Sequence, residues 1–167
     1  MALSSELTSL AAEVVKRLAE KGERVAVAES LTGGLLAATL VSVPGASKVF
    51  VGGAVTYATE VKHALLGVSS DVLGTYGPVC ADVAEQMASA VREKLGVTAD
   101  YGVSTTGVAG PDPDAFSGIE AGVFYIACAT GRGVLAERHK VAGDRETVRK
   151  SAVTAALHLL LNQIAAA

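Results

Sequence analysis

The sequence AESLTGG at residues 28–34 joins two apolar segments and limits the folds that this chain can adopt. The segment before it, 24–28, predicts a buried strand, and the segment after it, 35–43, predicts a helix. A small-residue turn between a strand and a helix leaves backbone N–H groups unpaired, and with the helix dipole these favour an anion or a developing oxyanion. Ser30 would lie at the carboxyl end of the strand, where open α/β sheets bind their ligands. The alternative is that Ser30 or Thr32 only caps the helix.

Composition predicts one domain with a core of small side chains. The chain has 167 residues, half of them hydrophobic, but only 4% aromatic residues and no Trp. A chain of this length is typical of a single domain, and its core must be built from Ala, Val and Leu. The net charge of −3 argues against a nucleic-acid-binding surface driven by bulk charge.

The sequence also predicts a protein without a membrane segment or a metal. The amino terminus has no basic region followed by an apolar one, and no apolar run approaches the ~18 to 20 residues that span a bilayer. We therefore expect a cytoplasmic protein. Cys80 and Cys128 are far apart without a CxxC motif, and His139 and His158 are isolated, so neither a disulfide framework nor a metal site is expected.

Strands and helices alternate along the chain, which predicts a mixed sheet covered by helices on both faces. The predicted helices cover 5–21, 35–43, 60–66, 71–76, 80–95 (closed by Gly96) and 145 to about 164. The predicted strands cover 24–28, 49–57, 101–105, 122–129 and 133–141, the last two forming a hairpin and the second being buried. Residues 111–120 form the longest predicted loop.

A second group of polar residues follows the predicted strand 49–57. Tyr57 would end that strand on the same edge of the sheet as Ser30, if the two strands run parallel. Lys62 would lie in the first turn of the next helix. A serine nucleophile needs a proton acceptor, and a lysine with a lowered pKa serves in Ser-Lys enzymes. The alternative for Lys62 is a solvated helix face, and His63, next in the sequence, is expected to point elsewhere.

Two arginines stand at the start of the last predicted helix. Arg145 and Arg149 are four residues apart on one face, where they oppose the helix dipole and repel each other. Gripping an anion such as phosphate would explain this placement. Pairing with Glu146 or another surface carboxylate is the alternative.

Other loop residues give weaker indications. The segment GVAGP at 107–111 lacks the Gly-Lys-Ser/Thr of a Walker loop and the dinucleotide fingerprint. It forms either a ligand-facing wall or a tight turn. Asp112 and Asp114 are carboxylates that can bind metals, but a solvated loop is the favoured interpretation.

Taken together, four motifs resemble the CinA-like family, the nicotinamide mononucleotide deamidases also called the competence/damage-inducible protein C-terminal domain. The motifs are AESLTGG (28–34), YATEVK (57–62), TGVAGP (106–111) and GDR (143–145). Their order and spacing match the family from about residue 5 to 164. Larger members carry an additional amino-terminal domain, and this chain resembles the stand-alone form. Residues 1–167 are thus expected to form a single CinA-like amidohydrolase domain.

The resemblance implies a three-layer α/β/α fold with a five-stranded mixed sheet. It also implies hydrolysis of the carboxamide of nicotinamide mononucleotide to nicotinic acid mononucleotide and ammonia. By position, Ser30 is the nucleophile, and Lys62 with Tyr57 activates it. A homodimer without cofactor is expected, acting on a small pyridine nucleotide. The residues expected to contact the substrate are Glu29, Thr32, Gly33, Thr106, Gly107 and Arg145, with Arg149 as the alternative phosphate ligand.

The chain departs from the family pattern at several positions. Leu31 stands where Cys is frequent, Thr59 where Asn is usual, and Cys80 where a capping Ser is common. The loop 112–122 lacks the family's glycine pair and the lysine of Lys-Pro-Val-Gly. Because this loop is expected to border the pocket, the exact substrate stays open. The alternative function is a catalytically silent module of the same fold that binds a nucleotide or a protein partner.

Overall fold

The structure, a computed structural model, describes residues 4–95 and 97–167. Its elements are α1 (Ser5–Lys21), β1 (Val25–Glu29), α2 (Leu35–Val41), the 3-10 helix η1 (Ala46–Lys48), β2 (Phe50–Val55), α3 (Thr59–Leu66), α4 (Ser70–Tyr76), α5 (Ala81–Lys94), β3 (Tyr101–Gly107), β4 (Val123–Thr130), β5 (Gly133–Lys140) and α6 (Arg145–Ala165). All predicted helices and strands are present with bounds close to those expected, and η1 is additional. Gly96, expected to close α5, lies outside the described residues. Among the described helices, none is long and apolar enough to cross a membrane.

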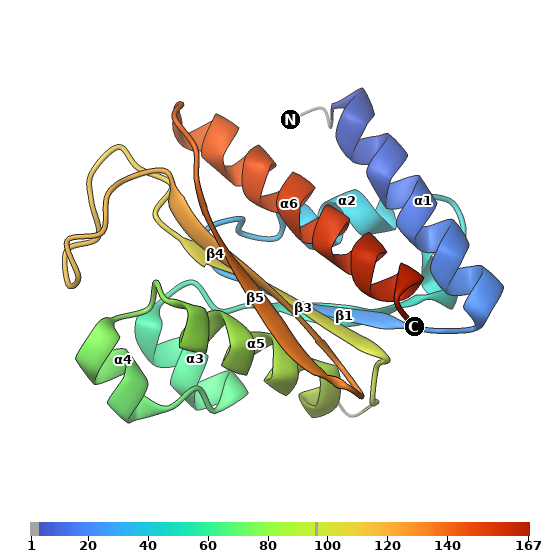
Figure 1. The fold of residues 1–167 in the computed structure, drawn as a ribbon, viewed down its shortest axis with the longest axis horizontal. Helices are drawn as coiled ribbons and strands as arrows, with labels where there is room; N and C mark the ends of the chain where they lie inside the picture. The colour runs from blue at the N-terminus through green and yellow to red at the C-terminus, as the bar shows by residue number, and fades with distance from the viewer. Residues whose placement is uncertain (1–3, 96) are drawn as a thin grey trace.

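The five strands form one mixed sheet in the order β2-β1-β3-β4-β5. β1 runs parallel to both β2 and β3, whereas β4 is antiparallel to β3 and to β5. Helices α1, α2 and α6 cover one face of the sheet, and α3, α4 and α5 cover the other (Figure 1). The predicted three-layer α/β/α architecture is therefore confirmed.

The central strand β1 shows why the sequence forms two cores. Side chains alternate between the faces of a strand, so Val25 and Val27 contact the large apolar cluster beneath α1, α2 and α6. Ala26 and Ala28 face the smaller cluster beneath α3 and α5. Small residues let α5 approach closely: a Cβ at Gly102 of β3 would lie 2.1 Å from a carbonyl oxygen of that helix.

One sequence prediction about the sheet is wrong. The strand 49–57 was expected to be buried, but β2 is an edge strand with a neighbour on one side alone. Of its six residues only Ala54 is buried, and Val55 is 50% exposed. The apolar run could not reveal the position of the strand in the sheet, because buried and edge strands both favour β-branched residues.

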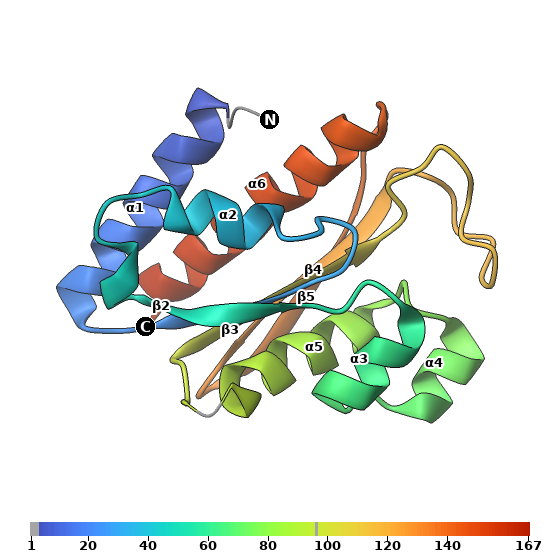
Figure 2. The same ribbon diagram turned by 180° about the vertical axis from the view of Figure 1, so that it is seen from behind.

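The carboxyl ends of β1, β2 and β3 meet at one edge of the sheet. Because β1 is parallel to its two neighbours, the segments that follow these three strands lie together, on the right of the view in Figure 2. Ser30 and Tyr57 therefore share this edge, as the sequence predicted for parallel strands. Thr106 and Gly107, which end β3, lie at the same edge.

Candidate active site

The turn that contains Ser30 is fixed by hydrogen bonds to neighbouring elements. The Ser30 N–H donates to Thr105 O of β3 (3.0 Å), and the Gly33 N–H donates back to Ser30 O (3.0 Å). Thr32 Oγ1 lies 2.7 Å from Thr105 Oγ1, and Thr32 is fully buried. Gly33 has φ +60°, and Gly34 has φ +97°, a conformation that glycine adopts without strain. Ser30 itself is 7% exposed.

Glu29 has a structural role that the sequence analysis missed. Its carboxylate is fully buried and accepts the N–H groups of Gly34 (3.0 Å), Leu36 (3.0 Å) and Ala37 (2.8 Å) at the start of α2. Both carboxylate oxygens are thus held inside the protein, which corrects the expectation that Glu29 contacts substrate. It also corrects the alternative that Ser30 or Thr32 caps α2: the N-cap residue is Gly34, and the Glu29 carboxylate accepts the N–H groups at the start of the helix.

Because of these contacts, the N–H groups at the start of α2 are no longer the candidate donors for an oxyanion. The N–H groups at the start of α2 were expected to be available, but Glu29 accepts three of them and Thr32 O accepts that of Leu35. Within the described residues, the N–H groups of Leu31 and Thr32 donate no hydrogen bond. These two donors follow Ser30 directly in the chain and remain without an acceptor in the part of the protein that the structure describes, which makes them candidates for stabilising an oxyanion.

Lys62 reaches the Ser30 hydroxyl from α3. Its side chain is 1% exposed, so the alternative of a solvated helix face is wrong. Nζ donates to Ser30 Oγ (3.0 Å), to Thr56 O (2.7 Å) and to Tyr57 O (3.2 Å). The Thr56 hydroxyl is buried beside this group and has no hydrogen-bond partner among the described residues. Thr56 was not singled out from the sequence, where its place at the end of β2 was the available signal.

The surroundings of Lys62 make its neutral form easier to reach than that of an exposed lysine. Burial lowers the pKa of Lys62 from 10.5 to about 8, and the charge of Glu60 opposes this shift. No carboxylate forms an ion pair with Lys62 in the part of the chain that the structure describes. In the neutral form, its two N–H groups can serve the carbonyls of Thr56 and Tyr57. The nitrogen lone pair then faces Ser30 Oγ, which is the arrangement of a general base.

Tyr57 contributes its backbone, not its hydroxyl, to the Ser30–Lys62 pair. The side chain is 56% exposed, and its hydroxyl accepts a hydrogen bond from Arg145 Nη2 (2.6 Å). Arg145 Nη1 donates to Gly110 O (2.9 Å). Tyr57 was expected to help Lys62 activate Ser30, but because the contact between Lys62 and Ser30 is direct, proton transfer between them needs no relay through the Tyr57 hydroxyl. Arg145 instead joins the segments that follow β2 and β3.

The second arginine of α6 points to the Ser30 turn. Arg149 Nη2 donates to Thr32 O (2.8 Å), next to Gly33. Asp144 caps α6 by accepting from the N–H of Thr147, and both arginines lie in the first two turns, as predicted. Glu146 pairs with Lys150 (2.5 Å), so the alternative pairing of the arginines with Glu146 is wrong. The two guanidinium groups thus diverge, one to the rim of the site and one to the turn.

Thr106 and Gly107, which were also expected to contact the substrate, make packing and hydrogen-bond contacts at the end of β3. Thr106 is fully buried, and its hydroxyl donates to Pro78 O (2.7 Å). A Cβ at Gly107 would lie 2.4 Å from the Cβ of Phe124, so this glycine permits close approach of β4. The side chains of Thr32 and Thr106 are thus both buried and hydrogen-bonded within the protein, and Gly107 allows β4 to pack closely. Contact of these three residues with a substrate through their backbone stays a prediction.

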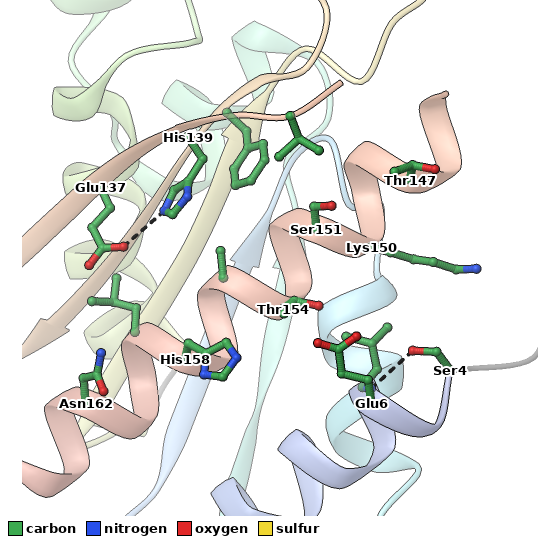
Figure 3. A pocket seen from close by; sticks show the side chains of 15 residues that line it. Ser4, Glu6, Glu137, His139, Thr147, Lys150, Ser151, Thr154, His158 and Asn162 are labelled. Atoms are coloured by element: carbon green, nitrogen blue, oxygen red, sulfur yellow. Dashed lines mark hydrogen bonds and ion pairs between the residues drawn. The ribbon is translucent and has the colours of Figure 1, made fainter. Parts of the chain in front are cut away.

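His139 and His158 lie apart from the Ser30 site. His139 and His158 both line a cavity of about 580 Å³ between β5, α6 and the start of α1 (Figure 3). The His139 ring stacks on Phe124, with centroids 5.1 Å apart, and its Nε2 lies 3.1 Å from Glu137 Oε2. The described residues include no group of three or more His, Cys, Asp or Glu side chains that could hold a metal ion.

Comparison with known proteins assigns the family. The sequence model of the CinA C-terminal domain matches residues 7–164 of the chain. The chain belongs to the CinA C-terminal domain family. The CinA-like protein of Frankia casuarinae is 44% identical over 157 residues, and that of Myxococcus xanthus is 43% identical over 157 residues. Each alignment covers 94% of this chain, but 35% and 37% of the respective relative. The chain thus spans about a third of the length of these CinA-like relatives.

Solved CinA-family structures share the whole fold. The competence/damage inducible protein CihA from Agrobacterium tumefaciens is 32% identical with a TM-score of 0.89, covering 97% of this chain and 98% of its own. The competence damage-inducible protein A from Klebsiella pneumoniae is 33% identical with a TM-score of 0.90, covering 95% of this chain and 97% of its own. The resemblance seen in the sequence motifs is therefore confirmed at the level of family and fold.

Proposed function

We propose that this domain is a serine amidohydrolase that removes the carboxamide nitrogen of nicotinamide mononucleotide. The observation that carries the proposal is the buried contact of 3.0 Å between Lys62 Nζ and Ser30 Oγ. A lysine buried without an ion-pair partner has little structural advantage, because burial of a charge is costly. Two carbonyl acceptors orient Nζ so that its third position faces the serine, which suits proton transfer.

In the proposed reaction, Lys62 acts as the base and then as the acid. Neutral Lys62 takes the proton of Ser30 Oγ while Oγ attacks the carboxamide carbon. The resulting oxyanion lies against the N–H groups of Leu31 and Thr32, each such donor contributing about 10²- to 10³-fold to the rate. Protonated Lys62 then gives its proton to the departing nitrogen, and ammonia leaves an acyl-serine. Water attacks this ester, Lys62 accepts the water proton and returns it to Ser30, and nicotinic acid mononucleotide is released.

Arg145 is the proposed ligand of the substrate phosphate. Its guanidinium bridges the Tyr57 hydroxyl and Gly110 O at the rim of the site, where donors remain for an anion. Arg149 donates a hydrogen bond to Thr32 O, and we propose that it holds the turn that contains Ser30 in place. This division assigns the binding of phosphate and the positioning of the turn to different residues of one helix.

The decisive test is release of ammonia from nicotinamide mononucleotide by the purified protein. We expect turnover that the Ser30→Ala variant lacks, at neutral to mildly alkaline pH. Trapping of an acyl-enzyme by mass spectrometry would place the intermediate on Ser30. Equal ammonia release by the wild-type protein and Ser30→Ala would overturn the proposal.

A second candidate is a catalytically silent module that binds the nucleotide without turnover. The low exposure of Ser30, at 7%, favours it, because the hydroxyl offers little surface to a substrate. A binding titration beside the ammonia assay separates the two functions. Saturable binding of the mononucleotide with no ammonia release would support the silent module.

A further inference from the structure

A cavity of about 620 Å³ lies next to the candidate active site and uses none of its catalytic residues. The start of α3, helix α4 and the loop 114–116 surround it. Figure 2 shows α3 and α4 on the same side of the sheet, with the loop beside them. A cavity of this size is in the range of small-molecule sites. It has no role in the reaction proposed above.

The lining combines apolar surface with carboxylates. Leu73, Pro78 and Phe116 supply apolar walls, and Glu60 and Asp114 supply carboxylates. Of the described residues that line the cavity, none is Lys or Arg, and the histidine among them, His63, has its Nδ1 2.8 Å from Val68 O. A phosphate or a carboxylate would meet repulsion from the two carboxylates here without a lysine or an arginine to compensate. The lining suits a flat apolar group that donates hydrogen bonds.

Phe116 is presented to this cavity by an ordered loop. Asp114 Oδ2 accepts from the N–H (2.7 Å) and the hydroxyl (2.6 Å) of Ser117, and the Gly118 N–H donates to Asp114 O (2.8 Å). A Cβ at Gly77 would lie 2.9 Å from the Phe116 ring, so the ring rests against the end of α4. Yet Phe116 is 63% exposed. A fixed, exposed ring at the wall of a cavity is suited to stacking on a planar ligand.

One hydrogen bond and one nearby charge connect the cavity with the Ser30 site. Thr106, at the end of β3, donates to the carbonyl of Pro78, which lines the cavity. Glu60 lines the cavity and stands two residues before Lys62 on α3, close enough for its charge to act on that amine. The cavity is thus next to the catalytic groups along α3 and at the same edge of the sheet.

We propose that this cavity binds a heterocyclic base with an exocyclic amino group, such as the adenine of a nucleoside. Phe116 covers the face of the base, and the carboxylates of Glu60 and Asp114 accept the amino N–H groups. Adenine meets both requirements, because it is planar, uncharged at neutral pH and carries an amino group that donates two hydrogen bonds. Hypoxanthine has the same shape with a carbonyl oxygen in place of that amino group, so the cavity should discriminate against it.

Such a base can come from two sources. It is either a separate nucleoside or the second half of a pyridine dinucleotide whose nicotinamide end lies at Ser30. The second source rests on the proposed amidohydrolase function, whereas the first does not. The chemistry of the cavity is the same in both cases.

The first arm of the test measures binding alone. Wild-type protein labelled with ¹⁵N is titrated with adenosine and, separately, with inosine. We expect adenosine to shift the amide signals of Gly74 and Ala115 in a saturable manner, and inosine to bind about tenfold more weakly or not at all. Phe116→Ala should weaken adenosine binding by about tenfold or more, which is the usual effect of losing one stacked ring. Tyr76→Ala is the matched control, because it removes an exposed aromatic side chain of α4 that does not line the cavity.

The second arm identifies the source of the base. Ammonia release is compared for the pyridine mononucleotide and the adenine dinucleotide. If the base belongs to the substrate, Phe116→Ala lowers kcat/KM for the dinucleotide about tenfold relative to the mononucleotide. If the base is a separate nucleoside, that ratio stays constant. Absence of all turnover would contradict the proposed function but leave the binding arm intact.

Three results of the binding arm overturn the inference. They are the absence of saturable shifts with adenosine, equal affinity for adenosine and inosine, and equal adenosine affinity of wild-type protein and Phe116→Ala. Because Phe116 lies on an exposed loop, the variant should fold, and an unchanged spectrum outside the cavity verifies this.

Discussion

The Ser30 turn and the loop 111–120 follow two neighbouring parallel strands, β1 and β3, but they are built differently. The turn is buried, and its hydrogen bonds reach β3, α3 and α6. The loop is largely exposed, and the bonds of Asp114 stay within it. Contacts with several distant elements therefore fix the turn, whereas the loop is held mainly by its own hydrogen bonds, together with the ion pair of Glu120 with Lys140 and the contact of Phe116 with the end of α4. This difference suggests that reaction chemistry resides in the turn and that the loop can change ligand preference without disturbing it.

Removing the base or the nucleophile should produce the largest effect. We expect Lys62→Met and Ser30→Ala each to lower kcat for ammonia release by at least about 10³-fold. The double variant should lose little more than either single variant, because the two residues act as one unit. Lys48→Met, which removes an exposed lysine, is the control and should keep full activity. Additive losses in the double variant would contradict a coupled pair.

Glu29→Gln tests how strongly the turn depends on its buried cap. An amide has one acceptor oxygen, and its NH₂ group would face a backbone N–H, so up to two of the three bonds to α2 are lost. We expect the free energy of unfolding to fall by about 2–4 kcal/mol in urea titration. Glu20→Gln, on the exposed face of α1, should change it by less than about 0.5 kcal/mol. Equal stability of the two variants would show that Glu29 does not support α2.

The fold could be read from the sequence because its periodic apolar segments are strong and alternate regularly. The Ser30–Lys62 proximity could also be expected, since parallel strands bring their carboxyl ends together. The role of Glu29 could not be predicted. Its carboxylate accepts N–H groups five to eight residues later in the chain, and whether it reaches them depends on the direction in which α2 follows the turn. The different partners of Arg145 and Arg149 could not be predicted either, because helical spacing places residues on one face without determining which groups their side chains contact.

The two arginines should have separable effects on kinetics. Arg145→Ala should raise KM for the mononucleotide by about 10- to 150-fold with little change in kcat, as expected for lost uniform binding of phosphate. Arg149→Ala should lower kcat about tenfold, because Thr32 O loses its side-chain donor and keeps only the Leu35 N–H, so that the adjacent N–H groups are less firmly positioned.

Nicotinamide riboside, which lacks the phosphate, is the matched substrate. Arg145→Ala should discriminate far less than the wild-type protein between nucleotide and riboside, whereas Arg149→Ala should discriminate as the wild type does. The reverse pattern would assign phosphate binding to Arg149.

A substitution in the loop 111–120 should have the smallest effect on stability and activity. Ser117→Ala removes two exposed hydrogen bonds of the Ser117 hydroxyl, the one it donates to Asp114 (2.6 Å) and the long one it accepts from the Ile119 N–H (3.4 Å). We expect the free energy of unfolding to fall by less than about 1 kcal/mol and kcat/KM for the mononucleotide to change less than twofold. A large loss of activity in Ser117→Ala would mean that the loop and the turn are not independent.

The pH dependence of kcat/KM tests most directly whether neutral Lys62 is the base. Its pKa is lowered by burial to about 8, so the amine loses its proton, and gains activity, as pH rises through that value. From about pH 6.5, where the substrate phosphate is largely ionised, kcat/KM should rise nearly tenfold per pH unit and level off above about pH 8 to 9. A rate that is independent of pH across this range, or that falls as pH rises, would contradict the assignment of Lys62 as the general base.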